Sequence, residues 1–443
     1  MRFVRYCIIY SAIIWCGIVN SVENGREHIS ISSKVPSKLK NELPGQLMKL
    51  NITVVSWNLC EKPPSDNDCN ILLKQQLDSD IVVIGVQELE DIRPRRNEGR
   101  RSVRWRQILK NIFDMQYKSV SRHKMGGLQI NVFVKKSCKR LVTDARVIEV
   151  ACGVGNVLTN KGGLCVLLKI KGNNVALINA HLAAHQNKVS ARNADYHRIM
   201  ENIYTNVKSS ETVTSFSSAA KHRVHKKRPR MAEDLKESPI DCIIFFGDLN
   251  YRVDLPRLEL EEFYLAWRQQ VGESIPGTKH ILPAIPSLTS SLRSLLSFDQ
   301  LLRERVQGRA FDGFREGPIT FPPTFKYDVD SIELDSSSKA RCPAWTDRVL
   351  YTAGRHVNPF LRYCKSNEDD SDNDMDNDLR FESVSSIIIN PTQKPRTEVE
   401  DTRESGLSLT LKRYYSVELR SSDHRPVCAE FSLSLTSDIN DNT

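Results

Sequence analysis

Polar residues that could bind a cation or activate water lie next to several apolar runs of the chain. Asn58 and Glu88 each come at the end of an apolar run, and Asp423 lies shortly before another. Their amide and carboxylate oxygens, without a set of thiolates, suit Mg²⁺, which keeps several waters and also takes phosphate oxygens of a substrate. The sequence therefore predicts metal-assisted hydrolysis of a phosphoester.

Histidines and a second acidic pair add groups that can move protons. Asp248 and Asn250 lie two residues apart, so on an extended backbone both side chains would face the same way. His181 follows a further apolar run, and His424 stands beside a carboxylate that would orient and polarise it. One such residue alone is usually a turn residue. The combination carries the prediction.

These residues need a rigid frame, and the apolar runs predict one. Strands are expected at Ile52–Trp57, Asp80–Val86, Gln129–Val134, Leu164–Ile170, Val175–Ala180, Ile240–Phe246, Val349–Thr352 and Val427–Leu433. Helices are expected at Asn70–Asp78, Arg104–Phe113 and Lys188–Val207. Strands that alternate with helices indicate an α/β domain with buried sheets. Ligands bind at strand ends in such sheets, because side chains there leave the core while the backbone stays rigid.

A series of short motifs carries a resemblance to a known family. In chain order they are VVSWN, GVQE, NKGG, NAHLAAH, GDLNYR, PTFKYD, CPAWTDR and SSDHRPV. This series resembles the inositol polyphosphate 5-phosphatase catalytic domain, part of the larger group typified by DNase I and the exonuclease III type of apurinic endonuclease. The resemblance implies an α/β four-layer sandwich, in which two mixed β-sheets pack face to face with helices outside. It also implies removal of the 5-phosphate from phosphoinositides, such as phosphatidylinositol 4,5-bisphosphate, or from soluble inositol polyphosphates.

The resemblance also implies roles for single residues. Asn58 and Glu88 would hold Mg²⁺, with Asp423 near the metal. The catalytic residues would be Asp248 and Asn250, which position and deprotonate water, His424 paired with Asp347, which stabilises the pentavalent phosphorus, and His181, which contacts the scissile phosphate. The substrate-binding residues would be Lys161, Lys326, Tyr327, Arg341 and Arg348.

Two departures from the family pattern stand out. Phe325 replaces the tyrosine of many relatives, which removes one hydroxyl contact to the substrate. The segment GNVLTNKGG is longer than the GNKGG of many members, so the path of this loop is left open.

Composition leaves several other functions to be compared. The formal net charge of +9 over 443 residues favours anionic partners. The arginine-rich stretch Arg93–Arg106 could track a nucleic acid, which keeps a nuclease of the same fold as an alternative. The other two alternative functions are a neutral-sphingomyelinase-like enzyme and a non-catalytic lipid-binding module. TFKYD and CPAWTDR favour the inositide branch, so we expect an inositide substrate, an anionic membrane surface, no nucleic acid and a monomer.

The ends of the chain predict its layout. Arg2 and Arg5 precede the apolar run Cys7–Val19, the arrangement of a signal peptide or anchor over residues 1–21. A linker (22–50), the catalytic domain (51–434) and a polar tail (435–443) follow, with insertions at about 209–238 and 366–405 too polar to order. The enzyme is expected at a membrane, in the secretory pathway if the signal is real and otherwise cytoplasmic. A reporter fused to residues 1–30 tests this, since a diffuse cytosolic reporter would contradict it.

Overall fold

The computed structural model describes residues 47–91, 99–153, 159–213, 239–272, 280–354 and 407–436. The predicted signal segment, nearly all of the predicted linker, most of the first predicted insertion and all of the second lie outside these residues. Among the described residues, no helix is both long and apolar enough to cross a bilayer.

Two mixed six-stranded sheets form the body of the domain. The first contains, in spatial order, β11 (Leu407–Ser416), β12 (Val427–Thr436), β1 (Leu47–Asn58), β2 (Ile81–Gln87), β4 (Leu128–Lys135) and β3 (Tyr117–Met125). The second contains β5 (Val142–Ala151), β6 (Gly162–Ile170), β7 (Asn173–His181), β8 (Cys242–Asp248), β10 (Asp347–Ala353) and β9 (Arg315–Glu316). One parallel pair lies inside each sheet, β1 with β2 and β7 with β8, and the other pairs are antiparallel.

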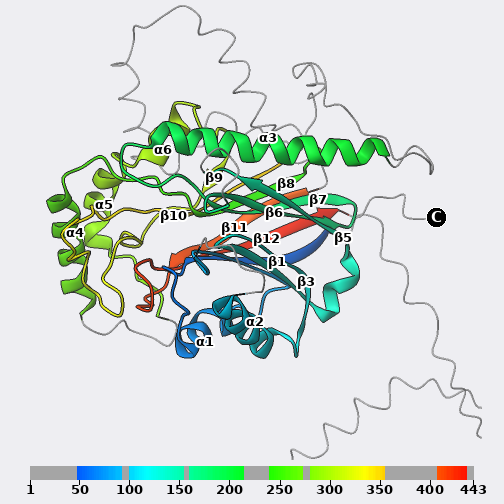
Figure 1. The fold of residues 1–443 in the computed structure, drawn as a ribbon, viewed down its shortest axis with the longest axis horizontal. Coiled ribbons are helices and arrows are strands. Elements are labelled where there is room, and N and C mark those ends of the chain that lie inside the picture. The colour runs from blue at the N-terminus through cyan, green and yellow to red at the C-terminus, as the bar shows by residue number, and fades with distance from the viewer. Residues whose placement is uncertain are drawn as a thin grey trace, which may run out of the picture. The chain divides into compact units, whose positions relative to one another are not determined.

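Helices cover the outer face of each sheet (Figure 1). On the first sheet these are α1 (Asp66–Lys74) and α2 (Arg100–Phe113), and on the second α3 (Val189–Val213) and α6 (Gln300–Val306). The remaining helices, α4 (Arg257–Val271), α5 (Thr289–Leu296) and the short 3₁₀ turns η1 (Lys136–Leu141) and η3 (Pro286–Leu288), complete the described elements. Local sequence sets two of these starts: Ser65 and Asp299 cap α1 and α6, and the side chain of each accepts a hydrogen bond from the backbone N–H three residues ahead.

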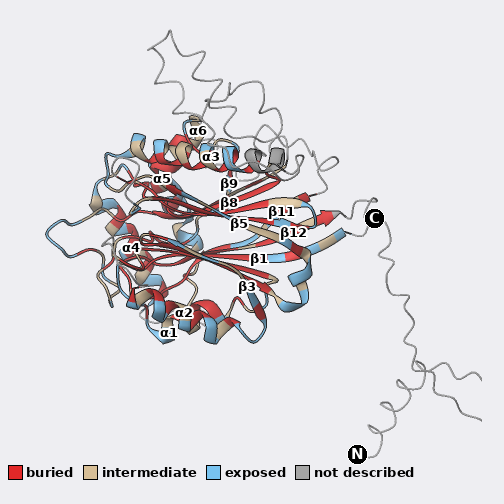
Figure 2. Ribbon diagram, turned by 45° about the vertical axis from the view of Figure 1, so that its right-hand side comes forward, coloured by how far each residue is buried: buried red, intermediate tan, exposed pale blue. Residues whose placement is uncertain are grey.

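Three clusters of buried apolar residues hold the sandwich together, and buried residues run along the strands of both sheets (Figure 2). Neighbouring residues of one strand enter different clusters: Val54 of β1 packs between the sheets, while Val55 packs under α1 and α2. Likewise Ile244 of β8 faces the other sheet and Phe245 faces α3. Central strands are therefore buried on both faces, which explains why they are unbroken apolar runs in the sequence. The predicted fold class is confirmed.

Two regular elements run a few residues past the domain limits predicted from the sequence, and those limits remain a prediction. Strand β1 begins at Leu47, inside the predicted linker, and Leu47 pairs with Thr436, beyond the predicted end of the domain at residue 434. Helix α3 continues to Val213, past the predicted start of the basic insertion.

Candidate active site

The polar residues that follow or precede the central strands lie together at one end of the sandwich. Strand register explains this: Asp248, at the end of β8, lies opposite His181 of β7 and Asp347 of β10. In the other sheet, Asn58 at the end of β1 is opposite Gln87 of β2, next to Glu88. A cavity of about 770 Å³ opens at this end, and its lining includes Glu88, His181, Asp248, Asp423 and His424.

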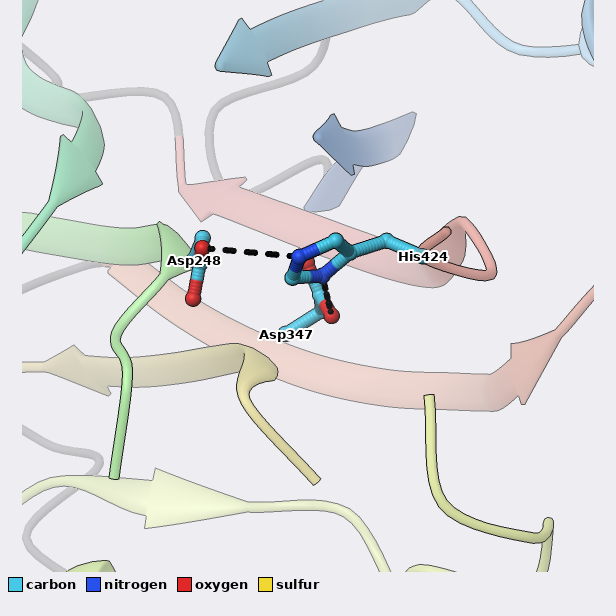
Figure 3. Close-up of side chains that lie close together, drawn as sticks. All are labelled: Asp248, Asp347 and His424. Carbon is cyan, nitrogen blue, oxygen red and sulfur yellow. Dashed lines mark hydrogen bonds and ion pairs between the residues drawn. The ribbon is translucent and has the colours of Figure 1, made fainter. Parts of the chain in front are cut away.

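His424 is held between two carboxylates (Figure 3). Its Nδ1 lies 2.8 Å from Oδ2 of Asp347, and its Nε2 lies 3.9 Å from Oδ2 of Asp248. The hydroxyls of Thr324 and Thr346 also donate to Asp347 Oδ2, at 2.7 and 3.0 Å. Burial by itself lowers the pKa of His424, but the charge of Asp347 and the hydrogen bond to it outweigh burial and raise that pKa to about 9. The imidazole is therefore a fixed cation near neutral pH.

Asp248 is buried and stays ionised. Its Oδ2 accepts from Asn58 Nδ2 at 3.0 Å and lies 3.3 Å from His181 Nε2, and its Oδ1 accepts from the Asn250 backbone at 3.1 Å. Burial would raise the pKa of Asp248, but the hydrogen bond from His181 and the positive charge of His424 hold that pKa well below its usual value. The carboxylate is therefore ionised near neutral pH and can accept a hydrogen bond from a water molecule.

Asn250 lines the cavity but does not point the way the sequence predicts. The residue has a φ of +58°, so the extended backbone of β8 has already ended and the two-residue alternation does not apply. Its Nδ2 donates to the Leu182 carbonyl at 3.0 Å, and its Oδ1 accepts from Arg252 at 2.5 Å. Asn250 thus ties together two loops of the cavity wall.

Cations form a second part of the cavity wall. Lys161 is hydrogen-bonded to His181, and its burial lowers the pKa of the ammonium. Lys326 is paired with Oδ2 of Asp423. The side chain of Arg341 is 38% exposed and lies 3.6 Å from Asp335, whose carboxylate also accepts the Arg341 backbone N–H. All three line the cavity, which therefore suits an anionic ligand.

Two of the three predicted metal ligands have oxygens that can reach a cation. Oδ1 of Asp423 is buried without a hydrogen-bond partner, and the Glu88 side chain is 40% exposed on the same cavity. These two carboxylates fit a hard divalent cation. Asn58 is 1% exposed, does not line the cavity, and uses its Oδ1 to accept the Cys60 backbone N–H at 2.9 Å.

A second group of donors satisfies the spacing of a metal site. Asp248, Asp347 and His424 have atoms that lie within 4.8 Å of one another. Because His424 already pairs with Asp347, we interpret this group as the proton-transfer machinery rather than as the cation site.

Comparison with known proteins decides the family. Residues 55–374 match the endonuclease/exonuclease/phosphatase family 2. The chain belongs to this family. Human synaptojanin-1 is 29% identical over 316 residues, 71% of this chain and 15% of its own length. Rat synaptojanin-2 is 31% identical over 304 residues, with 68% and 15% covered. Type II inositol polyphosphate 5-phosphatase 14 of Arabidopsis thaliana is 29% identical over 264 residues, with 57% and 21% covered.

These relatives confirm the predicted resemblance to inositol polyphosphate 5-phosphatase domains. The chain spans only 15% of the length of the synaptojanins that it matches. A solved structure of the inositol polyphosphate 5-phosphatase domain of SpSynaptojanin, in complex with inositol (1,4)-bisphosphate and calcium, has a TM-score of 0.58 at 22% identity, covering 89% of this chain and 87% of that one. Cimex nitrophorin has a TM-score of 0.53 at 16% identity, with 87% and 99% covered. Since both share the fold, the function of this family member must be argued from its site.

Two residues predicted to bind substrate do not line the cavity. Tyr327 is 2% exposed; its hydroxyl donates to the Pro323 carbonyl at 2.6 Å, and Arg425 lies 3.8 Å above its ring. Arg348 is also 2% exposed and binds Asp299 and Glu316 at distances between 2.6 and 3.0 Å. Both predictions are corrected: these side chains point into the core and support the loops that carry Lys326 and Asp347.

Arg348→Met is expected to destabilise the fold, although it leaves every cavity-lining side chain in place. The change removes a partner that Asp299 and Glu316 both use while they are buried, which typically costs about 3–5 kcal/mol. Urea unfolding measures this loss. Arg146→Met is the matched control, because Arg146 and its partner Asp144 are almost half exposed and such pairs contribute about 0–1 kcal/mol. Equal stability of both variants would contradict this structural role.

Several cavity residues were not predicted from the sequence. They include Cys60, His185, Gln186, Arg252, Asp254 and Lys339, and Phe325, which the sequence marked only as a departure from the family pattern, lines the cavity as well. The Phe325 ring is tilted by 38° against the His424 ring, with ring centres 4.6 Å apart, and the guanidinium of Arg252 lies 4.4 Å from the centre of the Phe325 ring. Their only sequence signal is their place within or beside the motifs.

Proposed function

We propose that this family member is a Mg²⁺-dependent phosphatase that removes the 5-phosphate from phosphoinositides or soluble inositol polyphosphates. The observation that carries the proposal is one cavity in which an ionised Asp248 and the His424–Asp347 pair face Lys161, Lys326 and Arg341. Acid–base groups with a ring of cations suit a phosphomonoester that bears further phosphates. The names of the relatives support the same substrate class.

The proposed chemistry divides the work among a few side chains. Asp248 orients the attacking water and takes its proton. His424, kept cationic by Asp347, stabilises negative charge on the phosphoryl oxygens. His181 and Lys161, which are hydrogen-bonded to each other, contact the scissile phosphate. Asn58 donates to Asp248 and so fixes the carboxylate that acts on water.

Glu88 and Asp423 are the residues that would hold Mg²⁺. When bound, the cation would neutralise charge that develops on the phosphoryl group. Asn58 would support this site indirectly, through its hydrogen bonds to the Cys60 backbone and to Asp248.

A substrate panel tests the proposed function. Phosphate release in Mg²⁺ is measured for phosphoinositides and soluble inositol polyphosphates. For the rival functions, strand cleavage of an abasic-site DNA duplex and phosphocholine release from sphingomyelin are measured. Release from inositides that carry a 5-phosphate, without release from those that lack it, is expected. Cleavage of DNA or sphingomyelin alone would overturn the proposal in favour of the nuclease or the sphingomyelinase-like alternative.

Arg341 and Lys326 are proposed to bind the uncleaved 4-phosphate. Arg341→Ala is expected to cost about 2–4 kcal/mol in kcat/KM on phosphatidylinositol 4,5-bisphosphate, because a charge-assisted contact that holds the reacting bond in line is lost. The cost should be small on a substrate without a 4-phosphate. Lys326→Ala should also lower kcat/KM more on the substrate with a 4-phosphate than on the one without. It should in addition lower kcat/KM on both substrates, because Lys326 also pairs with Asp423.

The matched control is Lys118→Ala, which removes an exposed cation of β3 outside the cavity. It should leave both substrates unaffected. Equal losses on the two substrates after Arg341→Ala would show that Arg341 does not read the 4-phosphate.

A further inference from the structure

One buried arginine of the cavity wall has no acidic partner. Four arginines are buried in the described part of the chain: Arg192, Arg252, Arg348 and Arg425. Two of them are paired with carboxylates, Arg348 with Asp299 and Glu316, and Arg425 with Glu418. Arg192 donates from both terminal nitrogens to backbone carbonyls and to the Gln300 amide, and it does not line the cavity. Arg252 does line it, and no described carboxylate lies within ion-pair distance of its guanidinium.

The guanidinium of Arg252 is fixed along one edge and on one face. Its Nε donates to the Asn250 carbonyl at 3.1 Å, and its Nη2 donates to Asn250 Oδ1 at 2.5 Å. Its face lies over the ring of Phe325, with 4.4 Å between the guanidinium carbon and the ring centre. Its Nη1 has no hydrogen-bond partner in the described part of the chain and is not fully buried. Because Arg252 lines the cavity, this nitrogen can donate to a ligand bound there.

The contacts of Arg252 place it beside the groups proposed to act on the substrate. The backbone N–H of Asn250, which holds the edge of the guanidinium, donates to Asp248 Oδ1 at 3.1 Å. The ring of Phe325, which holds its face, lies 4.6 Å from the ring of His424. One intervening residue therefore separates Arg252 from Asp248 on one side and from His424 on the other.

We propose that Arg252 is a further catalytic residue, whose Nη1 donates a hydrogen bond to a non-bridging oxygen of the scissile phosphate. A buried cation without a partner is costly, and a bound phosphate would supply the missing negative charge. The contact would be a charge-assisted hydrogen bond that stabilises negative charge on the phosphoryl oxygens during hydrolysis. The inference rests on the proposed function in one respect, namely that a phosphomonoester binds between Asp248 and His424.

This role differs from the one proposed for Arg341 and from a purely structural role. Arg341 is more exposed, lies beside Asp335, and is proposed to bind the uncleaved 4-phosphate. Loss of Arg252 should instead lower kcat/KM to a similar extent on substrates with and without a 4-phosphate. If Arg252 only held the Asn250 turn in place, its loss would lower stability without changing the affinity of the folded protein for phosphate.

Binding of inorganic phosphate tests the proposal without any turnover. The unfolding midpoint of the full chain is measured against phosphate concentration in Mg²⁺ at constant ionic strength, and the dissociation constant follows from the rise in the midpoint. Arg252→Gln should bind phosphate about 10–100-fold more weakly, the usual contribution of one hydrogen bond to a charged group. Arg252→Lys should lie between the two, because it keeps the charge but loses the planar fork. Steady-state assays on the two inositide substrates then measure kcat/KM.

Arg413→Gln is the matched control. Arg413 also lies over an aromatic ring, that of Tyr415 at 4.6 Å, but its side chain is exposed and lies outside the cavity. This variant should bind phosphate as the wild type does, and circular dichroism establishes that each variant is folded.

Two results would overturn the inference: wild-type phosphate affinity in folded Arg252→Gln, or a loss of kcat/KM confined to the substrate with a 4-phosphate. If Arg252→Gln does not fold, Arg252→Lys takes its place, and wild-type phosphate affinity in that variant would overturn the inference. Phosphate binding that depends on Arg252 in a chain that releases no inositide phosphate would instead overturn only the proposed function.

Discussion

Asp248→Asn is expected to lower kcat by about 10²–10⁴-fold, with much less effect on KM, because it removes the general base. Asparagine keeps the shape of the side chain and its contact with the Asn58 amide, but it has no negative charge and cannot accept a proton from water. The loss is measured as steady-state phosphate release from an inositide substrate. The hydrogen bond from His181 and the charge of His424 hold the pKa of Asp248 low. The side chain is therefore ionised in the wild type, and the substitution removes a full negative charge.

The matched control is Asp144→Asn, in an exposed ion pair on β5. It should leave kcat unchanged. Because the substitution at Asp248 occurs in the core, the unfolding midpoint of that variant is measured alongside. Wild-type turnover by a folded Asp248→Asn protein would remove Asp248 from the mechanism, and a large rise in KM alone would make it a binding residue.

Removal of divalent cations is expected to abolish phosphate release, and added Mg²⁺ should restore it. Glu88→Ala should lose most of the turnover even in Mg²⁺, because one of the two carboxylates that would hold the cation is gone and charge on the phosphoryl group is no longer neutralised. Steady-state assays across a Mg²⁺ titration measure both effects. Glu149→Ala, an exposed glutamate on β5, is the control. Full activity in excess EDTA would contradict the metal assignment.

The sequence predicted the central strands and missed the edges, for a physical reason. Strands buried on both faces are unbroken apolar runs, and all of those predicted are observed. The missed strands β3, β5, β9 and β11 are the outer strands of the two sheets. Edge strands such as β3 and β5 are mostly exposed or half-buried, with buried residues only at or next to their ends, and they carry several charged residues, so no apolar run marks them.

The site was predictable where residues sit at strand ends. Register alone brings Asp248, His181 and Asp347 side by side, so their types and positions were enough. Prediction failed where the direction of a side chain depends on the local backbone conformation or on partners that are distant in the sequence. Arg348 adjoins Asp347 in a motif, but alternation along β10 turns it to Asp299 and Glu316. Lys339 and Cys60 reach the cavity through loop conformations that no periodicity reports.

The position of the phosphate that leaves tests the central claim most directly. Phosphatidylinositol 4,5-bisphosphate is incubated with the full chain and Mg²⁺, and the lipid product is identified by ³¹P NMR or by separation against the two monophosphate standards. The account predicts phosphatidylinositol 4-phosphate and free phosphate, with neither formed by Asp248→Asn. Phosphatidylinositol 5-phosphate as the product would contradict it, and so would the absence of phosphate release from both this lipid and soluble inositol polyphosphates when the chain is folded and Mg²⁺ is present.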